Sequence, residues 1–300
     1  MNFNKQLTVK ICGDIVETID VEHPNTIAHT IRISKKEYMV VETGEIKEIN
    51  PYKNRTQNMQ SLRRSMAMVV DLINTNTTDI SKCRWVTLTY TDNMTDTKKL
   101  YKDFKNFRGR LKRRYKKDGY EFEYLSIYEP QSRGAWHIHM LLIFNKTAPF
   151  LENDEIYRLW GHNGYVSAKR VFNNGNAGLY YTAKISDTVI DDLSKIPKDI
   201  NKKDLKYIIV KERGRAIKKA VIKGDRLHLY PPGFNFYSNS RGLKKPIKCK
   251  MTYDEVEQYI KNLKKVKEYT HEITDDNGNI INRIIKKTYK KQKAKRGKVI

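Results

Sequence analysis

Two histidines and a carboxylate stand close together in a segment with the pattern of two β-strands. His137 and His139 are separated by Ile138, and Glu129 lies eight residues before His137. Because alternate side chains of a strand point to the same side, both imidazoles would face one way. Two imidazoles and a carboxylate form a partial ligand set, and open sites with nitrogen and oxygen donors favour Mg²⁺ or Mn²⁺. The sequence therefore predicts a metal site that acts on phosphate.

The same residues also have ordinary structural explanations. Histidines occur in sheets as hydrogen-bonded residues, and Glu129 could be an exposed strand-end carboxylate beside Pro130. The apolar run over residues 140–144 favours a functional role, because it predicts a buried central strand in which polar side chains need partners. A site with His137, His139 and Glu129 as metal ligands is the interpretation that we carry forward.

A tyrosine further along the chain could act as a nucleophile. Tyr181 and Lys184 are three residues apart, so on a helix they would share one face. A phenol has a pKa of about 10, and an ammonium group beside a metal-bound phosphate would favour the phenolate. Attack on phosphorus by Tyr181 would give a phosphotyrosine and free a hydroxyl terminus. Tyr180 is the rival nucleophile, although it would lie about 100° around the helix.

The charge of the chain indicates a polyanionic partner. Its 300 residues include 59 lysines and arginines and 34 acidic residues, which gives a net charge of +25. Residues 1–50 are slightly acidic, so the basic surface belongs to the rest of the chain. Such a field attracts nucleic acid, whereas solubility alone would not explain the uneven distribution.

Cysteine usage and hydropathy indicate the compartment. Cys12, Cys83 and Cys249 are far apart and predict neither a disulfide framework nor a zinc cage, as expected in a reducing interior. The first residues lack an apolar signal core, and no run of about 18 apolar residues occurs. We therefore expect a cytoplasmic protein with no membrane partner.

The elements that must position the candidate residues follow a strand-helix-strand-strand-helix-strand-helix order. Strands joined by a short turn pair antiparallel, so the turn at Gly134 would bring Glu129 close to the histidines. The fold class is therefore α+β, with an antiparallel sheet and helices packed on one face. Strands are predicted over 84–90, 121–129, 136–144 and 165–172, and helices over 100–115, near 153–160 and around 180–185.

Arginines on the helix over 100–115 are candidate phosphate contacts. Its expected buried stripe runs from Leu100 to Tyr115, and its other side is dense in cations. A merely solvated face is the alternative for these cations, and a surface turn is the alternative for the arginine of the Ser-Arg-Gly segment near residue 240. The predicted nucleic-acid contacts are Arg108, Arg110, Arg113, Arg114 and Arg241.

The flanking regions give weaker patterns. Residues 1–50 alternate apolar and polar positions, and helical spacing begins near residue 58 and continues for about twenty residues. A short strand is expected over 227–230. The predicted division is a β-rich N-terminal segment over 1–50, the candidate catalytic domain over 51–190, a C-terminal extension over 191–285, and a mobile basic tail over 286–300.

Two local signals stand out in the C-terminal extension. Thr252 and Glu255 have the spacing of a capping box, which opens a helix expected to turn Leu263 and Val266 inward. Asn277-Gly278 lies between two alternating segments and predicts a hairpin turn.

Three segments in this order resemble the motifs of the HUH endonucleases. They are Trp-Val-Thr-Leu-Thr-Tyr over 85–90, His137-Ile138-His139 followed by apolar residues, and Tyr181-Thr-Ala-Lys184. Within that superfamily, the chain is similar to the rolling-circle replication initiation proteins of bacterial plasmids and phages. The resemblance covers about residues 55–245 of the sequence.

The resemblance implies a five-stranded antiparallel sheet of the RRM- or ferredoxin-like HUH fold, and Mg²⁺ or Mn²⁺ held by His137 and His139. Glu129 fits the place of a further acidic ligand. Tyr181 would cut one strand of origin DNA, stay on the 5′ phosphate and leave a 3′ hydroxyl to prime synthesis. Single-stranded or origin DNA would be the partner, with a host helicase and polymerase as further candidates. Members with two nucleophiles have a second tyrosine where this chain has Ile185, which implies cutting by one tyrosine.

Other interpretations stay open. A conjugative relaxase or a single-tyrosine transposase would use the same chemistry, although relaxases commonly present a third histidine and the small transposases are shorter. A non-catalytic RRM-like binder would need exposed aromatic rings on its sheet and would leave His137 and His139 unexplained. A histidine-triad hydrolase would need a histidine at the position of Leu141.

Overall fold

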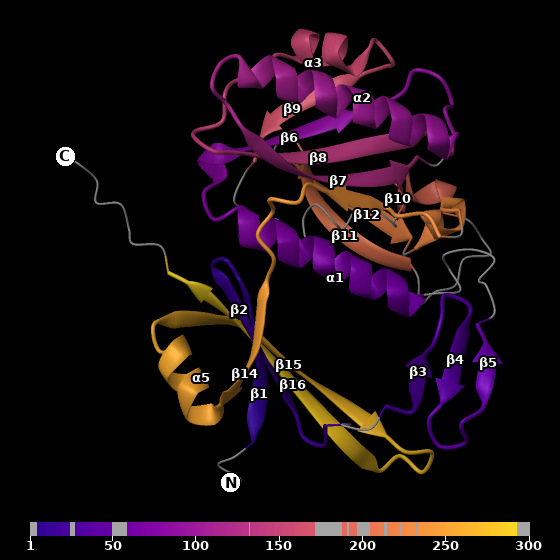
Figure 1. The fold of residues 1–300 in the computed structure, drawn as a ribbon, viewed down its shortest axis with the longest axis vertical. Coiled ribbons are helices and arrows are strands. Elements are labelled where there is room, and N and C mark those ends of the chain that lie inside the picture. The colour runs from indigo at the N-terminus through magenta and orange to yellow at the C-terminus, as the bar shows by residue number, and fades with distance from the viewer. Residues whose placement is uncertain are drawn as a thin grey trace. The chain divides into compact units, whose positions relative to one another are not determined.

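The structure is a computed structural model that divides into two compact units, which are drawn in Figure 1. Unit 1 combines the two ends of the chain, Met1–Tyr52 and Lys245–Ile300, and unit 2 is Lys53–Lys244. The structure describes residues 5–24, 28–49, 59–131, 133–171, 188–190, 192–196, 205–212, 215–222, 224–231 and 233–292.

Unit 2 contains a five-stranded sheet in which every neighbouring pair is antiparallel. The strand order is β13-β7-β8-β6-β9. The predicted succession of strands and helices is confirmed from β6 to β9, whereas the edge strand β13 was not expected. The strands are β6 (Cys83–Leu88), β7 (Phe122–Pro130), β8 (Trp136–Phe144), β9 (Val166–Arg170) and β13 (Tyr237–Asn239).

Two helices cover one face of this sheet. In α2 (Thr97–Lys116), the side chain of Asp96 caps the first turn by accepting hydrogen bonds from two backbone N–H groups. The second helix, α3 (Asn153–Trp160), ends at Gly161, whose φ of 78° is the left-handed conformation that glycine adopts without strain. The predicted apolar stripe of α2 is confirmed, since all five of its residues are buried: Leu100, Phe104, Phe107, Leu111 and Tyr115.

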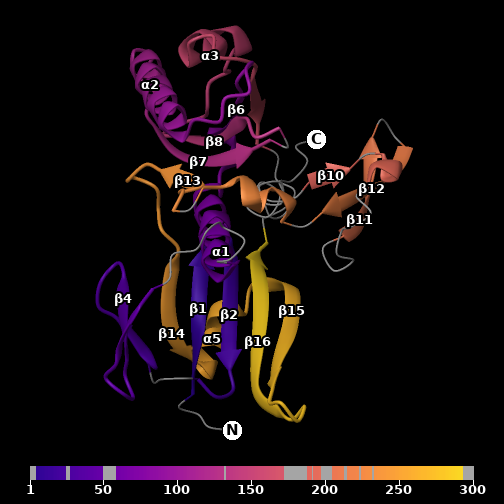
Figure 2. The ribbon, with the colours of Figure 1, turned by 90° about the vertical axis from the view of Figure 1, so that its right-hand side faces the viewer.

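The prediction that the helices pack on one face only is wrong. Figures 1 and 2 show α1 (Met59–Asn76) on the side of the sheet opposite α2 and α3. Leu62, Val69 and Ile73 of α1 are buried in the same core as the strands. The reason is visible in β8, where Met140, Leu141 and Leu142 are consecutive and all buried, so both faces of the strand require an apolar cover.

The rest of unit 2 follows the five-stranded sheet and includes a second, antiparallel sheet with the order β10-β12-β11. The expected strand over 227–230 is wrong, because this segment begins in a 3₁₀ helix, η4 (Asp225–Leu229). Gly224 precedes η4 with a φ of 71° and its carbonyl accepts from the N–H of Leu227, which closes a turn instead of extending the chain. The strands of the second sheet are β10 (Thr188–Ile190), β11 (Leu205–Glu212) and β12 (Arg215–Ile222), and the short 3₁₀ helices are η2 (Ile80–Lys82) and η3 (Leu193–Lys195).

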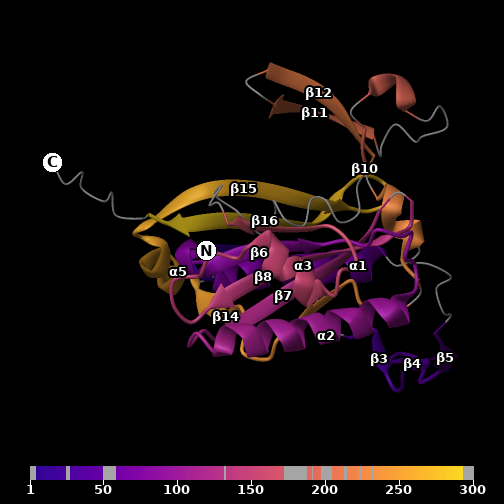
Figure 3. The same ribbon diagram turned by 90° about the horizontal axis from the view of Figure 1, so that it is seen from above.

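Unit 1 contains another five-stranded antiparallel sheet, with the order β14-β1-β2-β16-β15. Its neighbouring strands come from opposite ends of the chain. The long strands β15 and β16 lie side by side, as Figure 3 shows, and the Asn277-Gly278 turn between them confirms the predicted hairpin. The strands are β1 (Gln6–Cys12), β2 (Ile15–Val21), β14 (Ile247–Thr252), β15 (Leu263–Thr274) and β16 (Ile280–Lys291).

One helix, α5 (Tyr253–Ile260), packs against this sheet through Val256. The predicted capping box of Thr252 and Glu255 is confirmed at its first turn. The expectation that Leu263 and Val266 continue the helix is wrong, since both lie in β15. Their spacing fits a helix as well as a strand, and the pairing with β16 decides for the strand.

The structure divides the chain differently from the predicted domains. The first and last segments are parts of one unit, because β1 pairs with β14 across more than 230 residues of sequence. The stretch of the expected basic tail up to Lys291 belongs to β16. Unit 1 also holds a small sheet of β3 (Thr30–Arg32), β4 (Glu37–Val40) and β5 (Ile46–Glu48). Among the helices that the structure describes, none is both long and apolar enough to cross a membrane.

Candidate active site

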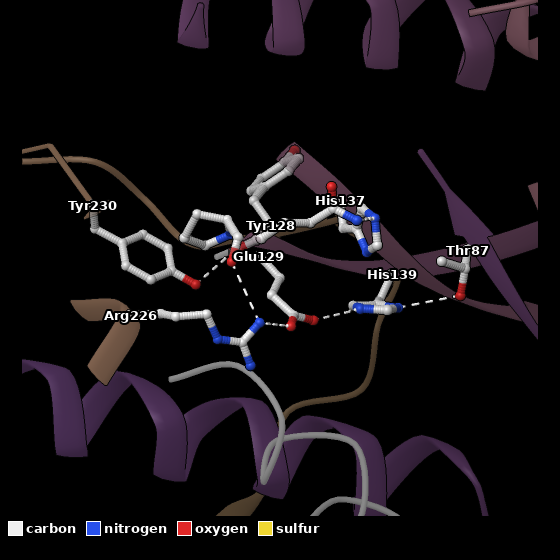
Figure 4. A network of polar contacts seen from close by, with 9 residues as sticks. Thr87, Tyr128, Glu129, His137, His139, Arg226 and Tyr230 are labelled. Carbon is white, nitrogen blue, oxygen red and sulfur yellow. Dashed lines mark hydrogen bonds and ion pairs between the residues drawn. The ribbon is translucent and has the colours of Figure 1, made fainter. Parts of the chain in front are cut away.

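The pairing of β7 with β8 brings the predicted metal ligands together. Glu129 lies directly opposite His137, and Ile127 lies opposite His139. Directly opposed residues of an antiparallel pair share a face, and so do alternate residues of one strand. Glu129, His137 and His139 therefore lie on one face of the sheet, as Figure 4 shows.

The ring of His139 is held from three sides. Its Nε2 atom lies 2.6 Å from Oε2 of Glu129, and its Nδ1 atom lies 3.2 Å from Oγ1 of Thr87. Thr87 is directly opposite His139 on β6. The ring also stacks on Trp85, with 5.7 Å between the ring centroids. These contacts fix the ring plane, so the Nε2 atom faces the carboxylate.

Arg226 completes this network from a distant part of the sequence. Its Nη1 atom donates to Oε1 of Glu129, which is 7% exposed, and to the carbonyl of Pro130 at 3.3 Å. Arg226 lies in η4, and the hydroxyl of Tyr230 just beyond η4 donates to the carbonyl of Tyr128 at 2.9 Å (Figure 4). Sequence reasoning missed Arg226, because no local pattern links residues 97 positions apart.

The protonation of the network follows from burial and charge. Burial alone would raise the pKa of Glu129, but the hydrogen bonds and charges of His139 and Arg226 lower it below its ordinary value. Burial lowers the pKa of His137 to about 4, against the opposing charge of Glu129. At neutral pH the network therefore contains an ionised Glu129 and a neutral His137, whose Nε2 atom contacts the side-chain amide of Gln131.

These donors suit a metal ion by their chemistry, while the arrangement itself is a hydrogen-bonded network. Neighbouring ligand atoms on an octahedral Mg²⁺ with bonds of about 2.1 Å are separated by about 3 Å. His139 Nε2 and Glu129 Oε2 are slightly closer, at 2.6 Å. Within the described residues, no group of three or more His, Cys, Asp or Glu side chains is arranged to hold a metal ion. Cation binding would have to replace the hydrogen bond between His139 and Glu129.

The predicted nucleophile and its helper fall outside this description. Tyr181 and Lys184 are not among the residues that the structure describes. Their distance from His137 and His139 is therefore not part of the observed geometry.

Two of the predicted phosphate contacts hold α2 in place. The guanidinium of Arg108 lies over the ring of Tyr124, 4.8 Å from its centroid, and donates to its hydroxyl. Arg110 donates to the carbonyl of Leu159 at 2.8 Å. Both arginines thus connect α2 to neighbouring elements of unit 2.

The remaining arginines differ among themselves. Arg114 forms ion pairs with Glu155 and Asp118, each at 2.5 Å, so its charge is balanced within the protein. Arg113 and Arg241 are exposed to solvent. Of the five predicted nucleic-acid contacts, these two are the ones whose side chains lie open to a partner.

Comparison with known proteins places this site in a recognised segment. Residues 83–189 match the model of a family of replication-associated proteins that is named after ORF2. The matched segment spans β6 to β9 and includes Glu129, His137, His139 and Tyr181. No curated protein and no solved structure matches the chain. The family match supports a rolling-circle replication initiator family for this chain.

Proposed function

We propose that this protein initiates rolling-circle replication by cutting one strand of origin DNA with Tyr181. The observation that carries the proposal is the shared face of Glu129, His137 and His139, within the segment that matches replication-associated proteins. A buried carboxylate beside two imidazoles is costly to a core unless each group has a partner or a function. Here the position of these groups coincides with the family match.

The proposed reaction is a transfer of the phosphoryl group to tyrosine. The phenolate oxygen of Tyr181 attacks phosphorus, and the bond between phosphorus and the 3′ oxygen breaks. The 3′ oxygen takes up a proton and becomes the free hydroxyl that primes synthesis. The 5′ phosphate stays on Tyr181 as a phosphodiester, so the strand can be rejoined later. Lys184, one turn away on a helix, would favour the phenolate by its charge.

We assign His137, His139 and Glu129 as the residues that would hold Mg²⁺ or Mn²⁺, which would polarise an oxygen of the scissile phosphate. The neutral His137 and the ionised Glu129 are in the protonation states that such ligands need. Thr87, at Nδ1 of His139, orients the ring for binding through Nε2. Arg226 holds the carboxylate of Glu129 in position.

The partner under this proposal is origin DNA, cut while single-stranded. A host helicase would open the duplex and a polymerase would extend the 3′ hydroxyl. Both belong to the proposal for an initiator of this kind.

Cutting of labelled oligonucleotides by two neighbouring variants tests the proposal. The wild-type protein is incubated with Mn²⁺ and a library of single-stranded oligonucleotides, and adducts that survive denaturation are separated. We expect 3′-labelled strands to be retained on the protein and 5′-labelled strands to be released. Tyr181→Phe should abolish the adduct, and Tyr180→Phe, the matched control, should retain it. An adduct that persists in Tyr181→Phe would overturn the assignment.

A further inference from the structure

The two faces of the five-stranded sheet in unit 1 differ in chemistry. Strand pairing places Leu7, Val9 and Val16 on one face with Tyr289, and these residues form an apolar core with Val256 of α5. On this face, charged residues oppose residues of the other sign. Cross-strand neighbours of opposite charge stabilise a sheet, so this face is satisfied within the protein. The charged pairs on it are Glu268 with Lys287, and Glu272 with Arg283.

The other face carries seven lysines, which we name the lysine face. Figure 2 looks onto it, with α5 behind the sheet. Among the residues of the five strands, Glu17 is the one carboxylate on this face, and it binds Lys10 and Lys286 at 2.6 and 2.8 Å. The lysines are Lys10, Lys248, Lys250, Lys264, Lys267, Lys286 and Lys290.

Like charges oppose each other on the lysine face. Lys10 lies directly across from Lys248, and Lys264 lies directly across from Lys290. Directly opposed like charges destabilise a sheet. Their presence on one face, while the other face pairs opposite charges, indicates a polyanion that offsets the repulsion when it binds.

The spacing of the lysine face fits a nucleic-acid backbone. Lys248 and Lys250 are alternate residues of β14, about 6.6 Å apart along the strand. Phosphates of one DNA strand rise about 3.4 Å per nucleotide, so two nucleotides cover nearly the same length. Lys264 and Lys267 lie on β15, four strand spacings or about 19 Å away, which exceeds the width of about 12 Å of a major groove.

The described strands of this face do not form the stacking platform of a single-strand binder. Surfaces that bind single strands place successive bases on exposed aromatic rings. On the lysine face the strands contribute one aromatic ring, Tyr269, which is 48% exposed and has the ammonium of Lys267 5.9 Å from its centroid. A face with many cations and one ring suits backbone contacts to a duplex.

We propose that the lysine face of unit 1 binds the phosphate backbone of duplex DNA. The choice of DNA as the polyanion rests on the proposed function. The surface itself is separate from the histidine site, because it lies in the other unit and contains none of the residues assigned to cutting. Duplex binding would keep the protein on the DNA that flanks the cut.

The test removes the four lysines of the outer strands, all of them exposed, from the full-length chain. The control removes four lysines from the α5 side of the same sheet and the end of α5, so the change in net charge is equal. The lysine-face variant is Lys248→Gln, Lys250→Gln, Lys264→Gln and Lys267→Gln. The control variant is Lys261→Gln, Lys265→Gln, Lys287→Gln and Lys291→Gln.

Affinity for a duplex of arbitrary sequence is measured by fluorescence anisotropy over a range of salt concentrations. Each phosphate contact contributes about 0.9 to the slope of log affinity against log salt, so four lost contacts should reduce the slope by about 3 to 4. The same relation predicts a loss of affinity of at least about 100-fold at 0.1 M salt. The control variant should change the slope by less than about 1. Circular dichroism melts confirm that both variants fold.

Three outcomes separate the possibilities. A selective loss of duplex binding in the lysine-face variant, with cutting of single-stranded oligonucleotides unchanged, supports the proposal. Equal losses in both variants would show a general effect of net charge and overturn it, as would a larger loss for single strands than for duplex. If wild type forms no adduct but the duplex result holds, the cutting function fails and the lysine face stands.

Discussion

The two five-stranded sheets of this protein place polar groups in opposite ways. The sheet of unit 2, here called the histidine sheet, is covered by helices on both faces and holds its polar groups in a network that includes the buried Glu129. The sheet of unit 1, here called the lysine sheet, has one face under α5 and one face lined with lysines. The first arrangement fixes a few groups in a defined geometry, and the second spreads charge over a surface. The contrast indicates chemistry in one sheet and binding in the other.

The sheets also differ in how the sequence builds them. Four of the five strands of the histidine sheet come from the continuous segment 83–170. The lysine sheet joins residues 6–21 to residues 247–291, so unit 2 is inserted between its strands in sequence. A site that needs precise contacts thus arises from local hairpins, apart from Arg226. The lysine sheet depends on closing a long loop, whose entropic cost grows only slowly with length.

The largest expected effect is the loss of one histidine from the histidine sheet. His139→Ala removes a proposed ligand and should lower the rate of single-strand cutting by at least about 100-fold, since metal polarisation of phosphate contributes several kcal/mol. EDTA should have the same effect on wild type. His162→Ala, an exposed histidine of the same unit, is the matched control and should cut normally. Equal cutting rates for His139→Ala and wild type would remove the distinction between the two sheets.

A smaller effect is expected from the cation that holds the carboxylate. Arg226→Met leaves Glu129 buried without its ion pair, which should lower the free energy of unfolding by about 3 kcal/mol. Cutting should fall about 10- to 100-fold, as for residues that orient metal ligands. Urea unfolding and oligonucleotide cutting measure the two changes.

A double variant separates the ion pair from simple packing. Glu129→Gln with Arg226→Met removes both charges, so its unfolding free energy should exceed that of Arg226→Met alone. Additive losses would contradict a coupled pair.

The smallest effect concerns the carboxylate of the lysine sheet. Burial would raise the pKa of Glu17, but hydrogen bonds and charges from Lys10 and Lys286 lower it below its ordinary value of 4.5. The stability that Glu17 contributes is therefore present above pH 4.5 and is lost as the pH falls through the lowered pKa. Glu17→Gln should cost about 1 kcal/mol at pH 7 and progressively less in acid. Urea unfolding of both proteins between about pH 3 and 7 tests this, and a difference independent of pH would contradict it.

Local patterns predicted much of the histidine sheet. The buried stripe of α2 follows from helical spacing between Leu100 and Tyr115, and the position of Glu129 opposite His137 follows from a short turn. Both features depend on residues that are near in sequence. In such segments the period of apolar residues and the turn chemistry determine the structure.

Long-range pairing explains what the sequence could not predict. Leu263 and Val266 have a spacing that fits a helix, and only β16 makes their segment a strand. The pairing of β1 with β14 and the contact of Arg226 with Glu129 join residues too far apart for any local signal. The lysine face was missed for the same reason, because its residues meet only when both chain ends form one sheet.

The account depends most directly on which residue becomes joined to DNA. Wild-type protein is incubated with Mn²⁺ and single-stranded oligonucleotides, digested with protease, and the DNA-linked peptide is identified by mass spectrometry. The account predicts one linked peptide that contains Tyr181, joined to the 5′ phosphate of the cut strand. A link at another residue, or cutting that leaves a 5′ phosphate free of protein, would contradict it.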